Sequence, residues 1–219
     1  MSVRILIADD HAVVREGLRM ILEASARGEM TVVGEALDGR DTIEKAEMLR
    51  PDVIVMDIAM PQMNGIEATR IICERLPEVK IIILSMHHTS EHIFRAIQAG
   101  ARSYLLKESA GTGVAKAVQA VMKGDYYFGT GVEAPPKALR SSRRSRPSSP
   151  LESLSPRERE VLQLVVEGKT SAEIADILSL SPKSVETYRS RLMPKLAVNN
   201  IPSLVKFALL HGITPADNN

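Results

Sequence analysis

Five polar side chains directly follow apolar, Val- and Ile-rich runs of this 219-residue chain. Asp9, Asp10 and Asp57 are carboxylates, and Ser85 and Lys107 follow two further runs. The carboxyl ends of parallel strands are where open α/β sheets bind their ligands. If the runs are neighbouring strands, their ends lie about 5 Å apart. The spacing therefore predicts that three negative charges gather at one edge of a sheet.

Such a cluster is stable only when it is protonated or binds a cation. Oxygen ligands without a nearby His or Cys favour Mg²⁺, which keeps waters and accepts a phosphate. One carboxylate beside the metal can then act as a nucleophile and form an aspartyl phosphate. Lys107 can bridge phosphate and carboxylate, and Ser85 can offer its hydroxyl to a phosphoryl oxygen. A single Asp after a strand is more often a turn or cap residue, so the prediction depends on the joint placement of all five.

The elements that position these residues alternate between strands and helices. We expect strands at residues 4–8, 31–35, 53–56, 81–84 and 103–106, and helices at 14–22, 41–49, 66–76 and 91–99. This alternation predicts βαβ units and a parallel sheet covered on both faces. The predicted fold is α/β, a doubly wound, five-stranded parallel sheet of about 125 residues.

A Pro-, Ser- and Arg-rich segment then breaks all periodicity, and we expect a mobile linker there. After it the pattern is wholly helical. Ser155, Pro156 and Glu158 have the spacing of an N-cap, a first helical residue and a capping box, and Gly168 marks the end of that helix. Further helices are expected at 171–178, from Ser181-Pro182, and at 200–210. The predicted domains are 1–127, a linker at 128–150, and an all-α, four-helix domain at 151–219.

Composition narrows the class of protein. The chain is 44% hydrophobic and 25% charged, which is typical of globular proteins. Cys73 is the single cysteine, so an intramolecular disulfide and a multi-cysteine zinc site are excluded. The N-terminus lacks the pattern of a signal peptide, and no run reaches the roughly 18 apolar residues of a membrane helix. We therefore expect a cytoplasmic protein with no membrane partner.

The net charge of +1 hides an uneven distribution. Residues 130–150 carry five basic and one acidic side chain, whereas residues 151–219 carry eight of each. The basic excess thus lies in the predicted linker, and the arginines there are either a solubilising tether or additional phosphate contacts. Evidence for a nucleic-acid partner has to come from motifs instead.

Residues 1–125 resemble the receiver domain of bacterial response regulators, which has a flavodoxin-like fold. The resemblance rests on Ile7-Ala8-Asp9-Asp10-His11, Leu84-Ser85, Leu105-Leu106-Lys107 and, most specifically, the segment Met56-Asp57-Ile58-Ala59-Met60-Pro61-Gln62-Met63-Asn64-Gly65.

This resemblance implies a role for each residue of the cluster. Asp57 is the phosphoacceptor, and Asp10, Asp57 and the backbone carbonyl of Ala59 ligate Mg²⁺, while Asp9 holds the metal through water. Ser85 and Tyr104 occupy the switch positions: Ser85 is expected to turn toward the phosphate and Tyr104 to pack inward behind it. Many receivers have Pro after the conserved Lys. Glu108 stands there in this chain, which leaves a cis peptide at that bond in doubt.

The later helices have helix-turn-helix spacing. Ala175 is small enough for two helices to cross closely, and Val185 lies ten positions later. A generic amphipathic helix pair has much the same pattern. The longer match decides: residues 154–162, 173–175, 184–186 and 195–196 resemble the LuxR-type DNA-binding domain. A receiver joined to this module is the NarL/FixJ-type response regulator.

On that fold the helix beginning near Lys183 enters the major groove of double-stranded DNA. Glu186 can accept a hydrogen bond from a cytosine amino group, or instead orient a neighbouring Arg, since a carboxylate is repelled by DNA. Thr187 can touch a thymine methyl group, and Ser190 can contact either kind of base. The remaining candidates are expected at phosphates or sugars: Lys169, Thr170, Lys183, Ser184, Arg189, Arg191 and Lys195.

Two departures from the family pattern affect this helix. Pro194 removes a backbone hydrogen bond, so the helix is expected to kink or end near Met193. Ala197 stands where Gly is common, so a reshaped turn is expected. In the last helix, Leu204, Val205, Ala208 and Leu209 form either a dimer surface or part of the small core.

The sequence thus predicts a transcription factor and not an enzyme. A sensor histidine kinase donates a phosphoryl group to Asp57, and a homodimer binds two DNA half-sites. One rival is a phosphatase or phosphotransferase with an aspartyl nucleophile, but its substrate cap would need longer loops. A second rival is a regulator that works without phosphorylation, which the complete set of cluster residues disfavours.

Overall fold

The computed structural model describes residues 2–25, 28–136 and 150–213. The chain divides into two compact units, Met1–Ser145 and Arg146–Asn219. Most of the predicted linker, including its arginines, lies outside the described residues. The predicted domain boundaries at 127/128 and 150/151 therefore stay predictions.

The first unit is built on one parallel sheet with the strand order β2-β1-β3-β4-β5-β6. Its principal strands are β1 (Val3–Ala8), β2 (Met30–Ala36), β3 (Val53–Asp57), β4 (Lys80–Ser85) and β5 (Ser103–Leu106). Each of the five predicted strands is present, within one residue at either end. Chain order reverses beside β1, which has β2 on one side and β3 on the other, and this is the switch point at which doubly wound sheets bind ligands.

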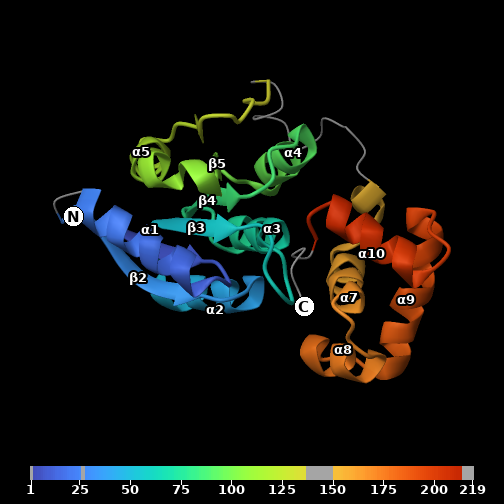
Figure 1. Ribbon diagram of the computed structural model, residues 1–219. Coiled ribbons are helices and arrows are strands. Elements are labelled where there is room, and N and C mark those ends of the chain that lie inside the picture. The colour runs from blue at the N-terminus through green and yellow to red at the C-terminus, as the bar shows by residue number, and fades with distance from the viewer. Residues whose placement is uncertain (1, 26–27, 137–149, 214–219) are drawn as a thin grey trace. The chain divides into compact units, whose positions relative to one another are not determined.

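Five helices cover the two faces of the sheet (Figure 1): α1 (Ala12–Ser25), α2 (Gly39–Leu49), α3 (Gly65–Arg75), α4 (Ser90–Ala99) and α5 (Ala110–Met122). Alternate residues of β1 pack on opposite faces. Ile5 and Ile7 join the core formed with α1 and α5, while Leu6 and Ala8 join the core formed with α2, α3 and α4. Because both faces are covered, the strands read as continuous apolar runs in the sequence.

A sixth strand, β6 (Tyr127–Phe128), was not among the five predicted. It pairs in parallel with β5, Ser103 opposite Tyr127 and Tyr104 opposite Phe128. A strand of two residues has too few positions to show alternation, so no periodicity marks it in the sequence. The sheet therefore continues past the predicted end of the first domain.

The second unit is all helical, with α7 (Pro156–Val166), α8 (Ser171–Leu178), α9 (Pro182–Leu196) and α10 (Ile201–Leu210). Capping residues fix where these helices begin. Ser155 and Glu158 form the predicted capping box of α7, and Thr170 and Glu173 form a second one at α8. Ser181 and Asn200 accept backbone hydrogen bonds at the starts of α9 and α10.

Of the two alternatives expected for α9, a kink or an end near Met193, the end is wrong, because the helix continues through Pro194 to Leu196. The fixed φ of proline is compatible with a helix, and its missing N–H removes one hydrogen bond, to the carbonyl of residue 190. The expected reshaping of the following turn is wrong, because Ala197 adopts the left-handed conformation, with φ 53° and ψ 39°, that glycine commonly supplies at the end of a helix. An L-residue in that conformation carries a steric cost that glycine avoids.

The last helix divides its apolar residues between the core and the surface. Leu204 and Ala208 are buried in the core of the second unit, so the dimer surface suggested for them is wrong. Leu209 and Leu210 are exposed, with 38% and 67% of their surface accessible.

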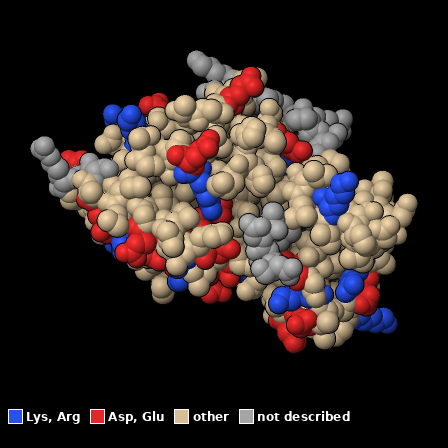
Figure 2. Space-filling view, in the orientation of Figure 1, with Lys and Arg blue, Asp and Glu red and all other residues tan. Residues whose placement is uncertain are grey.

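Acidic and basic side chains are interspersed on the face seen in Figure 2. Among the described residues, no helix is both long enough and apolar enough to cross a membrane.

Replacing Ala197 by Gly should stabilise the second unit, because glycine adopts a left-handed backbone without the clash of a Cβ atom. We expect the free energy of unfolding to rise by about 0.5–1 kcal/mol, measured by chemical denaturation. The control is Ala172→Gly, at an exposed position within α8, which should lower the stability instead. A destabilised Ala197→Gly variant would contradict the assigned conformation.

Candidate functional site

Three carboxylates meet at the carboxyl ends of β1 and β3. These strands are neighbours in register, with Ala8 opposite Met56, so Asp9 follows β1 beside Asp57, the last residue of β3. Asp9 is 1% exposed and Asp57 3% exposed, whereas the side chain of Asp10 is 25% exposed. The predicted gathering of carboxylates at this edge is present.

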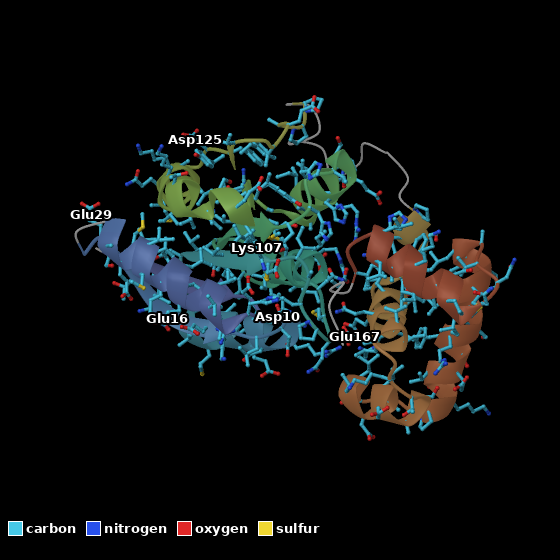
Figure 3. The ribbon with its side chains drawn as sticks, viewed as in Figure 1. Asp10, Glu16, Glu29, Lys107, Asp125 and Glu167 are labelled. Carbon is cyan, nitrogen blue, oxygen red and sulfur yellow. The ribbon has the colours of Figure 1, made fainter. Side chains whose placement is uncertain are left out.

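Lys107 places a positive charge among them. Its Nζ lies 2.7 Å from Asp57 Oδ2 and 2.8 Å from Asp9 Oδ2. The lysine follows β5, in the short 3₁₀ turn η1 (Lys107–Ser109), and Figure 3 labels it together with Asp10. The described residues contain no cis peptide bond, so the bond before Glu108 is trans. One lysine thus ties together two carboxylates that lie 48 residues apart in the sequence.

Burial controls the protonation of this cluster. Desolvation raises the pKa of Asp57 to about 7; Lys107 opposes this shift, and the charges of Asp9 and Asp10 add to it. Burial alone would lower the pKa of Lys107, but the two carboxylates that it contacts outweigh burial and raise it. Lys107 is therefore cationic at neutral pH. The ionised form of Asp57, by contrast, lowers the free energy of unfolding, because burial disfavours its charge.

The acidic cluster fits a divalent cation. Asp9 Oδ2 and Asp10 Oδ1 are buried and accept no hydrogen bond, although Lys107 Nζ lies 2.8 Å from the first and His11 Nδ1 lies 2.7 Å from the second. One potential ligand atom from each of the three carboxylates and His11 lies within 4.8 Å of the others. Buried anionic oxygens of this kind are the ligands that Mg²⁺ prefers.

The expectation that no His lies near the cluster is wrong. His11 Nδ1 is 3.2 Å from Asp9 Oδ1, and the backbone N–H of His11 donates to that same oxygen. The imidazole is 59% exposed, so it lies at the mouth of the cluster and the carboxylates form its interior. The donor set remains dominated by oxygen, which keeps it suited to Mg²⁺.

Arg15 is a residue of this site that the sequence did not reveal. Its Nη1 donates to the backbone carbonyl of Asp9 at 2.9 Å, and its Nε donates to Glu35 at 2.8 Å. Arg19 also donates to Glu35, and these two arginines lower the pKa of that carboxyl. The network holds the end of β1 in place. No local pattern could reveal it, because Glu35 lies 20 residues beyond Arg15.

Gly65 lets α3 begin directly against the phosphoacceptor candidate. A Cβ atom at this position would lie 1.9 Å from the backbone oxygen of Asp57, far inside contact distance. Asn64 caps the same helix by accepting a hydrogen bond from the N–H of Glu67. The loop that carries Ala59 is thereby folded back, with the N–H of Gly65 bonded to the carbonyl of Ile58.

The two predicted switch residues meet at His87. The hydroxyl of Ser85 accepts a hydrogen bond from the N–H of His87, and the hydroxyl of Tyr104 donates to the carbonyl of His87 at 2.7 Å. Tyr104 is fully buried, and burial raises the pKa of its phenol to about 12, so it remains a donor at neutral pH. Tyr104 therefore already points inward. The loop after β4 is linked to both side chains through the backbone of one residue, His87.

The second unit presents the predicted face of α9. Lys183, Glu186, Thr187 and Ser190 are all exposed. Ala175 of α8 and Val185 of α9 lie in one core, as the helix-turn-helix spacing predicts. The hydroxyl of Thr187 donates to the carbonyl of Lys183, and the side chain is exposed outside the core of the second unit.

The other candidates for DNA contact lie in several environments. Thr170 is an exposed N-cap, and Arg191 is exposed on α9. Ser184 is half-buried, and its hydroxyl lies 2.9 Å from that of Ser181. Lys169 is half-buried near the start of α8. Lys195 contacts both carboxylate oxygens of the buried Glu158, at 2.7 and 2.8 Å, and this ion pair helps to lower the pKa of that carboxyl against the effect of burial.

A doubly wound sheet with a buried aspartate beside a lysine and two further carboxylates, followed by a separate helix-turn-helix unit, defines a two-domain DNA-binding regulator. Residues 5–119 match the response regulator receiver domain, and residues 152–208 match the bacterial regulatory proteins of the luxR family. The chain belongs to the LuxR-type response regulators, which are transcriptional regulators.

Individual relatives agree with this assignment over almost the whole chain. The transcriptional regulatory protein LiaR of Bacillus subtilis is 41% identical, covering 90% of this chain and 92% of LiaR. The response regulator UvrY of Escherichia coli K12 is 37% identical, covering 98% and 97%. The structure of RcsB from Salmonella enterica serovar Typhimurium, bound to a promoter in the presence of a phosphomimetic, is 29% identical with a TM-score of 0.57, covering 98% and 100%.

Replacing Asp57 by Asn should raise the melting temperature of the chain at pH 8 in EDTA, because it removes a buried negative charge. An unfolded Asp releases its proton near pH 3.8 and the folded Asp57 near pH 7, so the wild type loses stability as the pH rises through this window. We expect a gain of about 1–3 kcal/mol at pH 8 and a smaller gain at pH 5, from thermal unfolding.

Mg²⁺ should reduce the difference in melting temperature between the wild type and Asp57→Asn, because a cation that binds only the folded wild type stabilises the wild type. Asp125→Asn, at an exposed aspartate of the same unit, serves as the control. It should leave the melting temperature unchanged both in EDTA and in Mg²⁺. If Asp57→Asn lowers the melting temperature at pH 8 in EDTA, the carboxylate is not held at a cost.

Proposed function

We propose that Asp57 accepts a phosphoryl group from the phosphohistidine of a sensor histidine kinase, and that this modification controls DNA binding. The observation that carries the proposal is the position of Lys107 Nζ, 2.7 Å from Asp57 and 2.8 Å from Asp9 at the carboxyl ends of the strands. A lysine there can neutralise an anion that joins the carboxylates. The resemblance to known receivers supports the same assignment.

In the transfer, one oxygen of Asp57 attacks phosphorus, a P–O bond forms, and the P–N bond to the kinase histidine breaks. Lys107 engages Oδ2, which leaves Oδ1 as the nucleophile. Mg²⁺, held by Asp9, Asp10, Asp57 and the carbonyl of Ala59, would supply charge neutralisation for the phosphoryl oxygens. Arg15 keeps the Asp9 backbone in position, and Lys107 remains paired with the product.

The switch begins at Ser85. To reach a phosphoryl oxygen, its hydroxyl turns toward Asp57 and gives up the hydrogen bond from the N–H of His87. Tyr104 retains the carbonyl of the same residue, so the loop after β4 rearranges around a fixed point. This is a local change in hydrogen bonding that biases a surface beside β4 and β5.

The DNA contacts that we propose lie on α9 and around the start of α8. The base-facing set is the exposed face of α9, and the remaining residues contact the sugar-phosphate backbone; together they comprise Lys169, Thr170, Lys183, Ser184, Glu186, Thr187, Arg189, Ser190, Arg191 and Lys195. Among these residues, Lys195 has the least support as a DNA contact, since its ammonium group is already paired with Glu158. A homodimer on paired half-sites supplies the affinity that one small unit lacks, and the DNA target makes the cytoplasm the compartment that we propose.

Acetyl phosphate with Mg²⁺ should add one phosphoryl group to the wild-type chain, detected by intact-mass spectrometry. Asp57→Asn should gain none, because an amide is not a nucleophile for this transfer. Asp125→Asn should be modified as the wild type is. An unmodified wild type would refute the phosphoacceptor assignment and favour a regulator that works without phosphorylation. A modified Asp57→Asn variant would refute the assignment by showing that another residue accepts the phosphoryl group.

Selection from a pool of random duplexes should enrich one motif with two half-sites when the phosphorylated chain is used. Thr187→Ala should relax the preference at one base position per half-site, at a cost below the roughly 1–3 kcal/mol of a bidentate base contact, because Thr187 contacts the base through a methyl group. Lys206→Ala, at an exposed lysine of α10, should leave the motif unchanged. If no motif is enriched, sequence-specific binding is excluded.

A further inference from the structure

The hydroxyl of Ser171 joins two side chains of α9. Ser171 is the first residue of α8, directly after the N-cap Thr170. Its Oγ accepts a hydrogen bond from Arg189 Nη1 at 3.0 Å, and the same hydroxyl donates to Glu186 Oε1. One hydroxyl group thus acts as acceptor and donor at once, which fixes the direction of its proton and links the two charged groups through a neutral bridge.

This contact accounts for the carboxylate on the exposed face of α9. Glu186 Oε1 is engaged at the N-terminus of α8, where the helix dipole favours a negative charge. A carboxylate that turned instead toward a cytosine would have to give up this bond while approaching an array of phosphates. The position of Glu186 therefore favours a role within the protein over a role in reading a base.

The hydrogen bond from Arg189 to Ser171 restricts the orientation of the guanidinium group. Arg189 lies three residues after Glu186 and is half-buried beside the start of α8. A guanidinium has five N–H donors, and the bond to Ser171 uses one of them. In a helix-turn-helix pair the first helix crosses the DNA backbone while the second enters the groove. The remaining donors of Arg189 thus lie at the junction where a phosphate passes both helices.

We propose that Ser171 is a positioning residue for DNA binding: together with Glu186 it holds Arg189 in the orientation that contacts a backbone phosphate. The proposal rests on the proposed DNA contacts of α9, and it changes the role of Glu186 from a base-reading residue to a second positioning residue. Ser171 touches no base in this arrangement. Its removal therefore weakens binding to every DNA sequence alike.

The first test measures the affinity of the phosphorylated full-length chain for two duplexes, the one enriched by selection and an unrelated one of equal length. Ser171→Ala should weaken binding to both by about 5–10-fold, the value of one hydrogen bond of ordinary strength. Ser171→Thr, which keeps the hydroxyl, should restore most of the affinity. Ser203→Ala, an exposed serine of α10, is the matched control and should bind as the wild type does.

The second test asks whether Ser171 and Glu186 act as one unit. Glu186→Gln should leave the enriched motif unchanged, and its effect on affinity should largely disappear in a Ser171→Ala background. A changed base preference in Glu186→Gln would overturn the proposal, because it would show that the carboxylate reads a base. Fully additive effects, or a Ser171→Ala loss confined to the enriched duplex, would overturn it as well.

These outcomes are separable from failure of the proposed function. If the wild-type chain enriches no motif, the sequence-specific function is refuted, and the affinity of Ser171→Ala for the unrelated duplex still decides the positioning role. A different result refutes only the positioning role: the wild type binds the enriched duplex, Thr187→Ala loses base preference, and Ser171→Ala binds both duplexes as tightly as the wild type does. Melting temperatures of all variants show whether a loss of binding reflects loss of folding.

Discussion

Mutual repulsion of three carboxylates, two of them almost without access to water, is the constraint on which the first unit depends. Like charges this close, in a medium that screens them poorly, cost several kcal/mol unless a cation joins them. Lys107 supplies one positive charge from the end of β5, which is separated from β3 by β4. The covered parallel sheet provides the rigidity, since only strands packed on both faces can hold these side chains together against their repulsion.

The second unit solves a different problem, because its function requires an exposed face of charged and polar side chains. Here rigidity comes from helix termini. Capping boxes at α7 and α8 fix the starts of two helices, and Glu158 extends its box by binding Lys195 near the end of α9. A carboxylate near the N-terminus of a helix thus contributes to the orientation of α9 at two places. Glu158 of α7 binds Lys195, and Glu186 of α9 binds Ser171 at the start of α8.

Local patterns in the sequence predicted the strands, the helix starts and the gathering of Asp9, Asp10 and Asp57, because periodicity and capping depend on residues only a few positions apart. What the sequence could not reveal depends on distant partners. Arg15 meets Glu35, Lys195 meets Glu158, and Ser171 meets Glu186 only after the chain has folded. Misjudged features also have physical reasons: β6 is too short to show a period, and Pro194 has a φ that is compatible with the helix and removes only one backbone hydrogen bond.

The sixth strand changes how the chain leaves the first unit. Gly129 donates its N–H to the carbonyl of Tyr104, and Phe128 is paired opposite that same residue. The segment by which the chain leaves the first unit is therefore bonded to the backbone of the tyrosine whose hydroxyl holds the loop after β4. One residue thus connects the exit of the first unit, through its backbone, with that loop, through its side chain.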